Sequence, residues 1–269
     1  MKKYWKISLL LVIVIIPVVI YLKPIDKEKI NILFIGNSLT YRNNMPTIFE
    51  GIAISKGKKV YVEDCTKGKA TIFGHSHRNA VKRAIKSQDW DYVIIQGSSR
   101  DFIRDSKIIQ NKTLPALERI IAMIQKNNPY TKMLFYMTWG YRDGYKPNKE
   151  ANTFLKMANK ISNQYLNLYK TYDIGVVPVG MAWKDSRKRR GDVKLYVKDG
   201  GHPSLKGSYL AASCFYAAIF NESPVGSNYY GKLGPKICYY LQSVAERNVM
   251  FHRKKYGLEG VDEIQKKKL

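Results

Sequence analysis

A serine follows directly after a strongly apolar segment, where its hydroxyl could act as a nucleophile. The segment Ile30–Ile35 (INILFI) is continuous and apolar, as buried parallel strands are, and Gly36-Asn37-Ser38-Leu39 comes next. Gly36 permits a tight turn, and if a helical turn follows, backbone amides near Ser38 would point toward a developing oxyanion. A serine after a strand is more often a helix cap, so Ser38 is a catalytic candidate only if a base accompanies it.

A second cluster, Asp199-Gly200-Gly201-His202-Pro203, contains such a base. A serine hydroxyl needs a base to take its proton, and that base needs an orienting carboxylate. Asp199 and His202 lie three residues apart on a glycine-rich loop, so the carboxylate can bond one ring nitrogen while the other faces Ser38. The alternative is a loop with a surface histidine and a helix-capping Ser204. Of the four histidines, His202 is the one with a carboxylate at a workable spacing.

The two clusters resemble the first and last sequence blocks of the SGNH (GDSL-like) hydrolase superfamily. GNSL matches the first block, with Asn37 in place of the usual acid, and DGGHPSLKGSYLAA matches the last. The resemblance spans about residues 30–220. It implies a serine esterase that works through an acyl-enzyme without a cofactor, with Ser38, His202 and Asp199 as its catalytic triad.

The resemblance also implies an oxyanion hole with three donors: the serine amide, a glycine amide after the second strand, and an asparagine side chain after the third. Ser38 and Gly68 match the first two. The third strand, Tyr92–Gln96, is followed by Gly-Ser-Ser and not by the usual Gly-x-Asn-Asp block. A subgroup with glutamine at this point, and with a Thr-Trp pair after the fourth strand, resembles this chain, which has Thr138-Trp139. Gln96, with the same amide on one more methylene, is therefore the predicted third donor.

Short apolar strands alternate with helical patterns along the chain, without an internal repeat. Five strands separated by helices predict a three-layer α/β domain with a parallel sheet, and the resemblance makes this a flavodoxin-like SGNH-hydrolase fold. In such sheets the ligand site lies beyond the carboxyl ends of the strands, where Ser38 falls. The clearest helix is Asn148–Tyr172, with Leu155 among its apolar stripe. The predicted strands are 30–35, 59–63, 92–96, 132–138 and 174–179, and the other helices 46–56, 76–86, 114–125, 205–220 and 235–253.

The N-terminal residues 1–25 are predicted to be a membrane anchor that precedes a hydrolase-like domain over residues 26–269. A basic start, Met1–Lys6, leads into the 16 uncharged residues Ile7–Leu22, close to the roughly 20 that span a bilayer. No small-x-small cleavage site follows, which favours an uncleaved anchor over a cleaved signal peptide; a buried core helix is a third alternative. The basic start favours a single-pass protein of a bacterial cell membrane with its domain outside the cytoplasm.

The formal net charge of +25 indicates attraction to polyanions such as an anionic membrane face, acidic wall polymers or nucleic acid. Because the domain is expected to face outward, no nucleic-acid partner is predicted, and an anionic surface polymer is the candidate. The alternative is that the charge only keeps the protein soluble. The densest basic run, Arg187–Arg190, is expected to be a solvated loop.

The remaining chemically suggestive residues carry weaker signals. Cys65, Cys214 and Cys238 lack the spacing of a disulfide framework or a zinc site; the last two are expected in the core, and a single disulfide stays open. His75 and His77 could ligate a metal, but no third ligand is evident and none is predicted.

Aromatic residues after the fourth strand, Trp139, Tyr141 and Tyr145, could line an acyl or sugar pocket or pack under a loop. No Walker loop, G-x-G-x-x-G or G-x-S-x-G motif is present, which argues against nucleotide chemistry and the α/β-hydrolase fold. The predicted function is hydrolysis of esters, first of all O-acetyl groups, on a cell-surface carbohydrate or lipid. Two alternatives stay open: O-acyl transfer by the same triad, and a catalytically inactive domain that binds polysaccharide.

Overall fold

The computed structural model describes residues 29–264, which form a five-stranded parallel sheet. The strand order β2-β1-β3-β4-β5 is the flavodoxin-like order, so the predicted α/β fold with five parallel strands is confirmed. The first and third strands lie side by side at the centre, which is why their residues are almost all apolar. The strands are β1 (Ile30–Gly36), β2 (Val60–Thr66), β3 (Tyr92–Ile95), β4 (Lys132–Tyr136) and β5 (Gly175–Val177).

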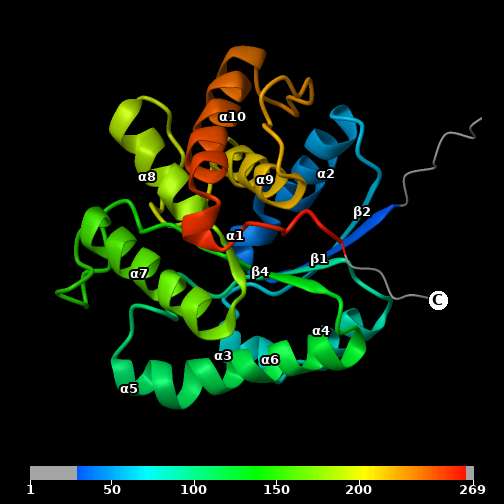
Figure 1. The fold of residues 1–269 in the computed structure, drawn as a ribbon. Coiled ribbons are helices and arrows are strands. Elements are labelled where there is room, and N and C mark those ends of the chain that lie inside the picture. Colours follow the sequence, from blue (N-terminus) through cyan, green and yellow to red (C-terminus); the bar gives the residue numbers. More distant parts are fainter. Residues whose placement is uncertain (1–28, 265–269) are drawn as a thin grey trace, which may run out of the picture.

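Helices cover both faces of the sheet. Figure 1 shows α2, α9 and α10 over one face and α3, α4 and α6 over the other, with α7 and α8 on the β5 side. The central helix α9 is buried on all sides between α2, α10 and the sheet, and its run of alanine residues lets its neighbours approach closely. The helices are α1 (Ser38–Tyr41), α2 (Met45–Ser55), α3 (Ile72–Ser76), α4 (Asn79–Lys86), α5 (Ser106–Ile108), α6 (Leu114–Asn127), α7 (Phe154–Tyr172), α8 (Val179–Arg189), α9 (Leu205–Phe220) and α10 (Pro235–Val249).

Two helix predictions were wrong in detail. The helix expected over 76–86 is α4, which begins only at Asn79; Ser76 ends the separate short helix α3, and His77 and Arg78 lie between the two. The long helix begins at Phe154 and not at Asn148, because Thr153 caps it by accepting a hydrogen bond from the amide of Lys156. Its second residue, Leu155, is consequently 55% exposed and does not join the core.

Among the helices that were not predicted, the longest is α8. Its buried residues, such as Ala182 and Trp183, are few, and the basic residues that follow hide the helical period. The basic run Arg187–Arg190 therefore covers the last turn and C-cap of a helix and is not the solvated loop that was expected. Cations at this end are favourable, because the helix dipole is negative there.

All three cysteines are free. Cys214 in α9 and Cys238 in α10 are fully buried, which confirms that they belong to the core. Burial raises the pKa of both thiols, so neither is a reactive thiolate at neutral pH.

The predicted membrane anchor, residues 1–25, lies outside the described residues. Within residues 29–264, no helix is both long enough and apolar enough to cross a membrane. The anchor and the location of the domain outside the cytoplasm stay predictions.

Candidate active site

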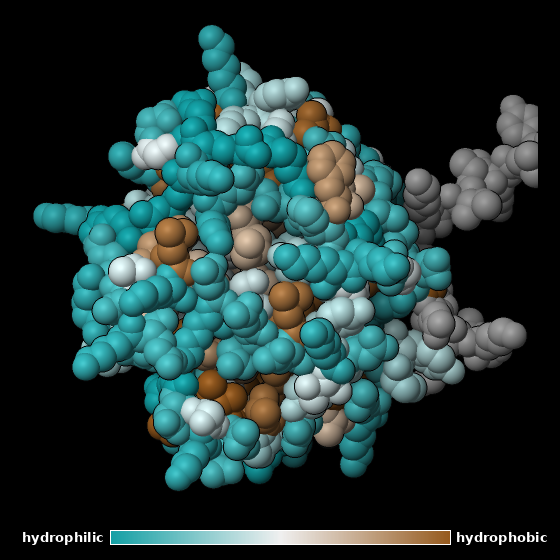
Figure 2. All heavy atoms as spheres, turned by 60° about the vertical axis from the view of Figure 1, so that its left-hand side comes forward, coloured by the Kyte–Doolittle hydropathy of each residue, from teal (hydrophilic) through white to brown (hydrophobic). Residues whose placement is uncertain are grey.

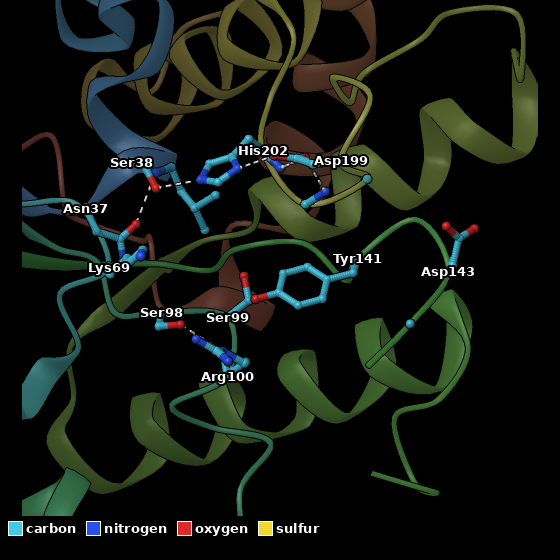
Figure 3. Close-up of a pocket in the computed structure, with 14 residues that line it drawn as sticks. Asn37, Ser38, Lys69, Ser98, Ser99, Arg100, Tyr141, Asp143, Asp199 and His202 are labelled. Carbon is cyan, nitrogen blue, oxygen red and sulfur yellow. Dashed lines mark hydrogen bonds and ion pairs between the residues drawn. The ribbon is translucent and has the colours of Figure 1, made fainter. Parts of the chain in front are cut away.

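The structure brings the three predicted catalytic residues together at the carboxyl end of the sheet (Figure 3). Ser38 Oγ lies 2.8 Å from His202 Nε2, and His202 Nδ1 lies 2.6 Å from Asp199 Oδ2. Ser38 begins α1 directly after β1, whereas His202 and Asp199 come from the loop before α9. Both distances are those of hydrogen bonds, so the hydroxyl, the imidazole and the carboxylate form one continuous hydrogen-bonded series.

The turn that presents Ser38 is held from several sides. Asn37 caps α1, because its Oδ1 accepts the amide of Leu39 at 3.0 Å while its Nδ2 donates to the carbonyl of Ala70 at 2.9 Å. Gly36 is required at the end of β1, since a Cβ there would collide with side-chain atoms beneath the turn. As the first residue of α1, Ser38 has an amide with no intrahelical acceptor, which leaves it available to a developing oxyanion.

The carboxylate of Asp199 is locked in one orientation. Its Oδ1 accepts the backbone amides of Gly201 and His202, both at 2.9 Å, which turns Oδ2 toward the imidazole. Burial opposes ionisation, but these two amide bonds and the imidazole together lower the pKa of Asp199 to about 2. An ionised Asp199 holds the ring proton on Nδ1, and Nε2 is then the acceptor that faces Ser38.

Backbone carbonyls of the catalytic loop are bonded to the segment after β4. The indole Nε1 of Trp139 donates to the carbonyl of Gly201 at 2.9 Å, and the amide of Arg142 donates to the carbonyl of Gly200 at 2.7 Å. Trp139 is itself fixed by stacking on Trp183, with ring centroids 3.8 Å apart and planes 10° from parallel. Trp139 thus packs beneath the loop, one of the two roles that the sequence left open, and supports the position of the base.

Gln96 lies in a different place from the predicted one. It is fully buried beneath the nucleophile turn, where its Oε1 accepts the amide of Asn37 at 2.7 Å and the hydroxyl of Thr40 at 2.8 Å. The Asn37 amide can only donate, so the carboxamide oxygen must face it, and Nε2 turns away to bond the carbonyl of Gly97. Gln96 does not line the pocket; in this geometry it supports the nucleophile turn instead of donating to an oxyanion.

Gly68, the other predicted donor, is an exposed residue in the turn that follows β2. It is not part of the pocket wall, whereas its neighbour Lys69 is. The backbone of Lys69 has φ of +61°, a left-handed conformation that side-chain-bearing residues rarely adopt. The turn therefore presents a lysine, and not only a glycine amide, to the pocket.

A pocket of about 400 Å³ opens in front of Ser38 (Figure 3). Ser99, after β3, is only 2% exposed, and among the described residues its hydroxyl has no hydrogen-bond partner. Tyr141 lies beside it, and burial raises the pKa of its phenol. The sequence reasoning missed Lys69, Ser98, Ser99, Arg100 and Asp143, which follow strands β2, β3 and β4 and could have been found by asking which side chains follow each strand.

The two histidines of the H-x-H pair do not form a metal site. His75 is fully buried in α3, whereas His77 is exposed and bonds Arg119 Nη1 at 2.8 Å. Within residues 29–264 there is no group of three side chains that could hold a metal ion. Burial, together with the nearby guanidinium of Arg78, lowers the pKa of His75 to about 4, so this histidine is neutral at physiological pH.

A family profile described as "Domain of unknown function (DUF4886)" matches residues 26–238, most of the chain. The chain belongs to the DUF4886 family. No curated protein matches the sequence. The fold is similar to that of a DUF4886 family protein from Bacteroides uniformis, with a TM-score of 0.69 and 20% identity over 83% of this chain and 96% of that one.

Solved structures outside the DUF4886 name also share the fold. A Slackia heliotrinireducens protein assigned to the SGNH hydrolases gives a TM-score of 0.54 and 24% identity, over 70% of this chain and 98% of that one. The acetyl xylan esterase AlAXEase gives a TM-score of 0.54 and 17% identity, over 71% of this chain and 100% of that one. At these identities the likeness shows the fold alone: the domain is built like the SGNH hydrolases.

Proposed function

We propose that this DUF4886 protein is a serine esterase that removes short acyl groups, O-acetyl groups first of all, from a hydroxyl-rich substrate. The observation that carries the proposal is the hydrogen-bonded series Ser38, His202, Asp199, with 2.8 Å and 2.6 Å between its members. A serine, a base within reach and an oriented carboxylate are what nucleophilic acyl transfer requires. The SGNH-like fold supports the same reaction class by analogy.

The geometry translates into a two-step reaction. Ser38 Oγ attacks the ester carbonyl as His202 Nε2 takes its proton, and Asp199 stabilises the imidazolium that forms. The negative charge on the carbonyl oxygen develops next to the free amide of Ser38 at the start of α1. His202 then protonates the leaving alcohol. Water attacks the acyl-enzyme in the reverse sequence, which releases the acid and restores the Ser38 hydroxyl.

The pocket wall favours a short acyl group and a polar alcohol over a long-chain lipid. Among its side chains only Leu39 and Tyr141 are large and apolar, whereas most of the others carry hydroxyl, amide or charged groups. Ser99 borders the pocket, and among the described residues its buried hydroxyl has no hydrogen-bond partner. The acetyl xylan esterase among the structural neighbours agrees with this choice.

The test uses the full-length protein in a mild non-ionic detergent, with Ser38→Ala as the matched variant. The wild type should react with a fluorophosphonate probe and hydrolyse p-nitrophenyl acetate much faster than the p-nitrophenyl ester of a long fatty acid, and Ser38→Ala should do neither. Free acetate as the product indicates hydrolysis, and an acetylated sugar acceptor would indicate transfer. Absence of any Ser38-dependent labelling and hydrolysis would sink the esterase proposal.

A further inference from the structure

A second hollow, of about 330 Å³, lies beside the catalytic pocket and is lined by basic side chains. The four cationic residues of this basic cleft are Arg142, Arg187, Lys194 and Lys198. No acidic residue belongs to its wall, which otherwise consists of Tyr196 and small or apolar residues. Clefts lined by one sign of charge focus the electrostatic potential and concentrate ligands of the opposite sign.

The basic cleft and the catalytic pocket share a wall. Within residues 141–144, Tyr141 and Asp143 line the pocket whereas Arg142 lines the cleft. Within residues 197–202, the first two line the cleft and the last four line the pocket. The two segments are bonded to each other, because Arg142 donates from its amide to Gly200 and from Nη1, at 3.4 Å, to the carbonyl of Lys198. A group held in the cleft is therefore separated from the catalytic residues only by this thin wall.

The cations of the cleft are largely uncompensated and partly fixed in place. The Arg187 guanidinium lies 3.9 Å from the ring centroid of Phe154 and 5.4 Å from that of Tyr196, and Nη1 donates to the carbonyl of Arg142 at 3.2 Å. Over residues 29–264, Arg142 forms an ion pair with Asp143, whereas the other three cations form none. A stacked arginine with donors to spare suits a carboxylate or phosphate, which it can bind through two parallel hydrogen bonds.

We propose that the basic cleft binds an anionic group of a polysaccharide substrate while a neighbouring acylated unit of the same strand lies at Ser38. The inference rests on the proposed esterase function and names its substrate class: an O-acylated acidic polysaccharide. Lys69 and Arg100 at the catalytic pocket extend the positive surface, and the net charge of +25 has the same sign. Figure 2 shows the side that carries α7 and α8 as mostly hydrophilic with small separate apolar groups, which suits a polar polymer better than a lipid surface.

The kinetic test compares full-length wild type with Lys194→Gln/Lys198→Gln, whose side chains are exposed, and with Lys82→Gln/Lys86→Gln on α4 as the charge-matched control. The substrates are O-acetylated polygalacturonate, which carries carboxylates, and acetylated glucomannan, which is neutral. The ratio of kcat/KM on the acidic to the neutral polymer should fall roughly tenfold in the cleft variant and stay constant in the control. The wild-type ratio should also fall as salt is added.

A binding test separates failure of this inference from failure of the esterase function. In the Ser38→Ala background, binding of unacetylated polygalacturonate is measured by calorimetry with and without the cleft substitutions, and inorganic polyphosphate is the second probe. Weaker binding in the cleft variant supports the site, and the stronger of the two probes identifies carboxylate or phosphate as its ligand. Equal binding by cleft and control variants, or a wild type without preference for the acidic polymer, overturns the inference, even where Ser38-dependent hydrolysis of p-nitrophenyl acetate persists.

Discussion

The substitution Asp199→Asn tests the catalytic series most directly. The two amides that bond Oδ1 at 2.9 Å can only donate, so an asparagine must keep its carbonyl oxygen there and turn its NH₂ group toward the imidazole. Nδ1, 2.6 Å from that position, then has to accept a hydrogen bond, and the ring proton moves to Nε2, which faces Ser38. His202 can no longer take the serine proton. A misplaced proton of this kind costs about 10⁴-fold in kcat, or about 5 kcal/mol.

The assay is the initial rate on p-nitrophenyl acetate, measured together with the thermal unfolding midpoint. Asp192→Asn serves as the control, because it also removes one carboxylate from an exposed site, where Asp192 bonds only Arg190. The residual rate of Asp199→Asn should rise with pH, since hydroxide replaces the missing base. In the wild type Asp199 should stay ionised at every pH above about 3 and add no titration to the rate profile there, because its pKa is about 2. If Asp199→Asn keeps more than roughly a tenth of the wild-type kcat with an unchanged fold, the triad reasoning is refuted.

Three further predictions concern fully buried residues outside the catalytic series, Gln96, Trp139 and His75. Gln96→Ala should lower the free energy of unfolding by roughly 2 kcal/mol, because it leaves the buried amide of Asn37 without an acceptor; denaturant titration yielding no change would contradict this support role. Trp139→Phe should lower kcat about fivefold at constant KM, since it removes the hydrogen bond to Gly201 but keeps an aromatic ring. Steady-state kinetics that show a change in KM in place of kcat would contradict this prediction. His75→Gln should make the free energy of unfolding less dependent on acid pH. The pKa of His75 is about 4 in the folded state and 6.5 in the unfolded state, so the wild type should lose up to about 3 kcal/mol of stability as the pH falls from 6.5 to 4. Equal losses in variant and wild type, measured by denaturant titration at several pH values, would contradict this role of His75.

Local patterns were sufficient for most of the fold. The central strands β1 and β3 are short and largely buried on both faces, and such segments are recognisable as apolar runs without knowledge of their neighbours; the edge strand β2 is mostly half-buried or exposed. The helix at Leu205–Phe220 was predicted with its observed bounds, because its apolar content is dense and Ser204 caps it. The prediction failed where the apolar periodicity was weak. α8 buries few apolar residues and was not predicted, and the start of α7 at Phe154 depends on the cap at Thr153.

In the site, too, the local features were predictable and the long-range ones were not. The pairing of Asp199 with His202 could be foreseen because the two lie three positions apart on one loop, where local backbone geometry sets their distance. The direction of the Gln96 side chain could not be foreseen, because its carboxamide oxygen accepts a hydrogen bond from the amide of Asn37, 59 residues away. A resemblance can assign a residue type to a position, but the hydrogen-bond partners around that position decide which way its donor points.

By itself, then, the sequence determined the fold class, the position of Ser38 at the end of a strand, and the local pairing of His202 with Asp199. Only the tertiary structure decided that Ser38 meets His202 across 164 residues, that Gln96 supports the turn from below, and that Arg142 joins the cations of residues 187–198 in one cleft beside the pocket at Ser38. The reason is physical: hydrophobic periodicity and loop spacing are properties of a short segment. Side-chain direction and charge clustering arise only when segments far apart in the chain pack together.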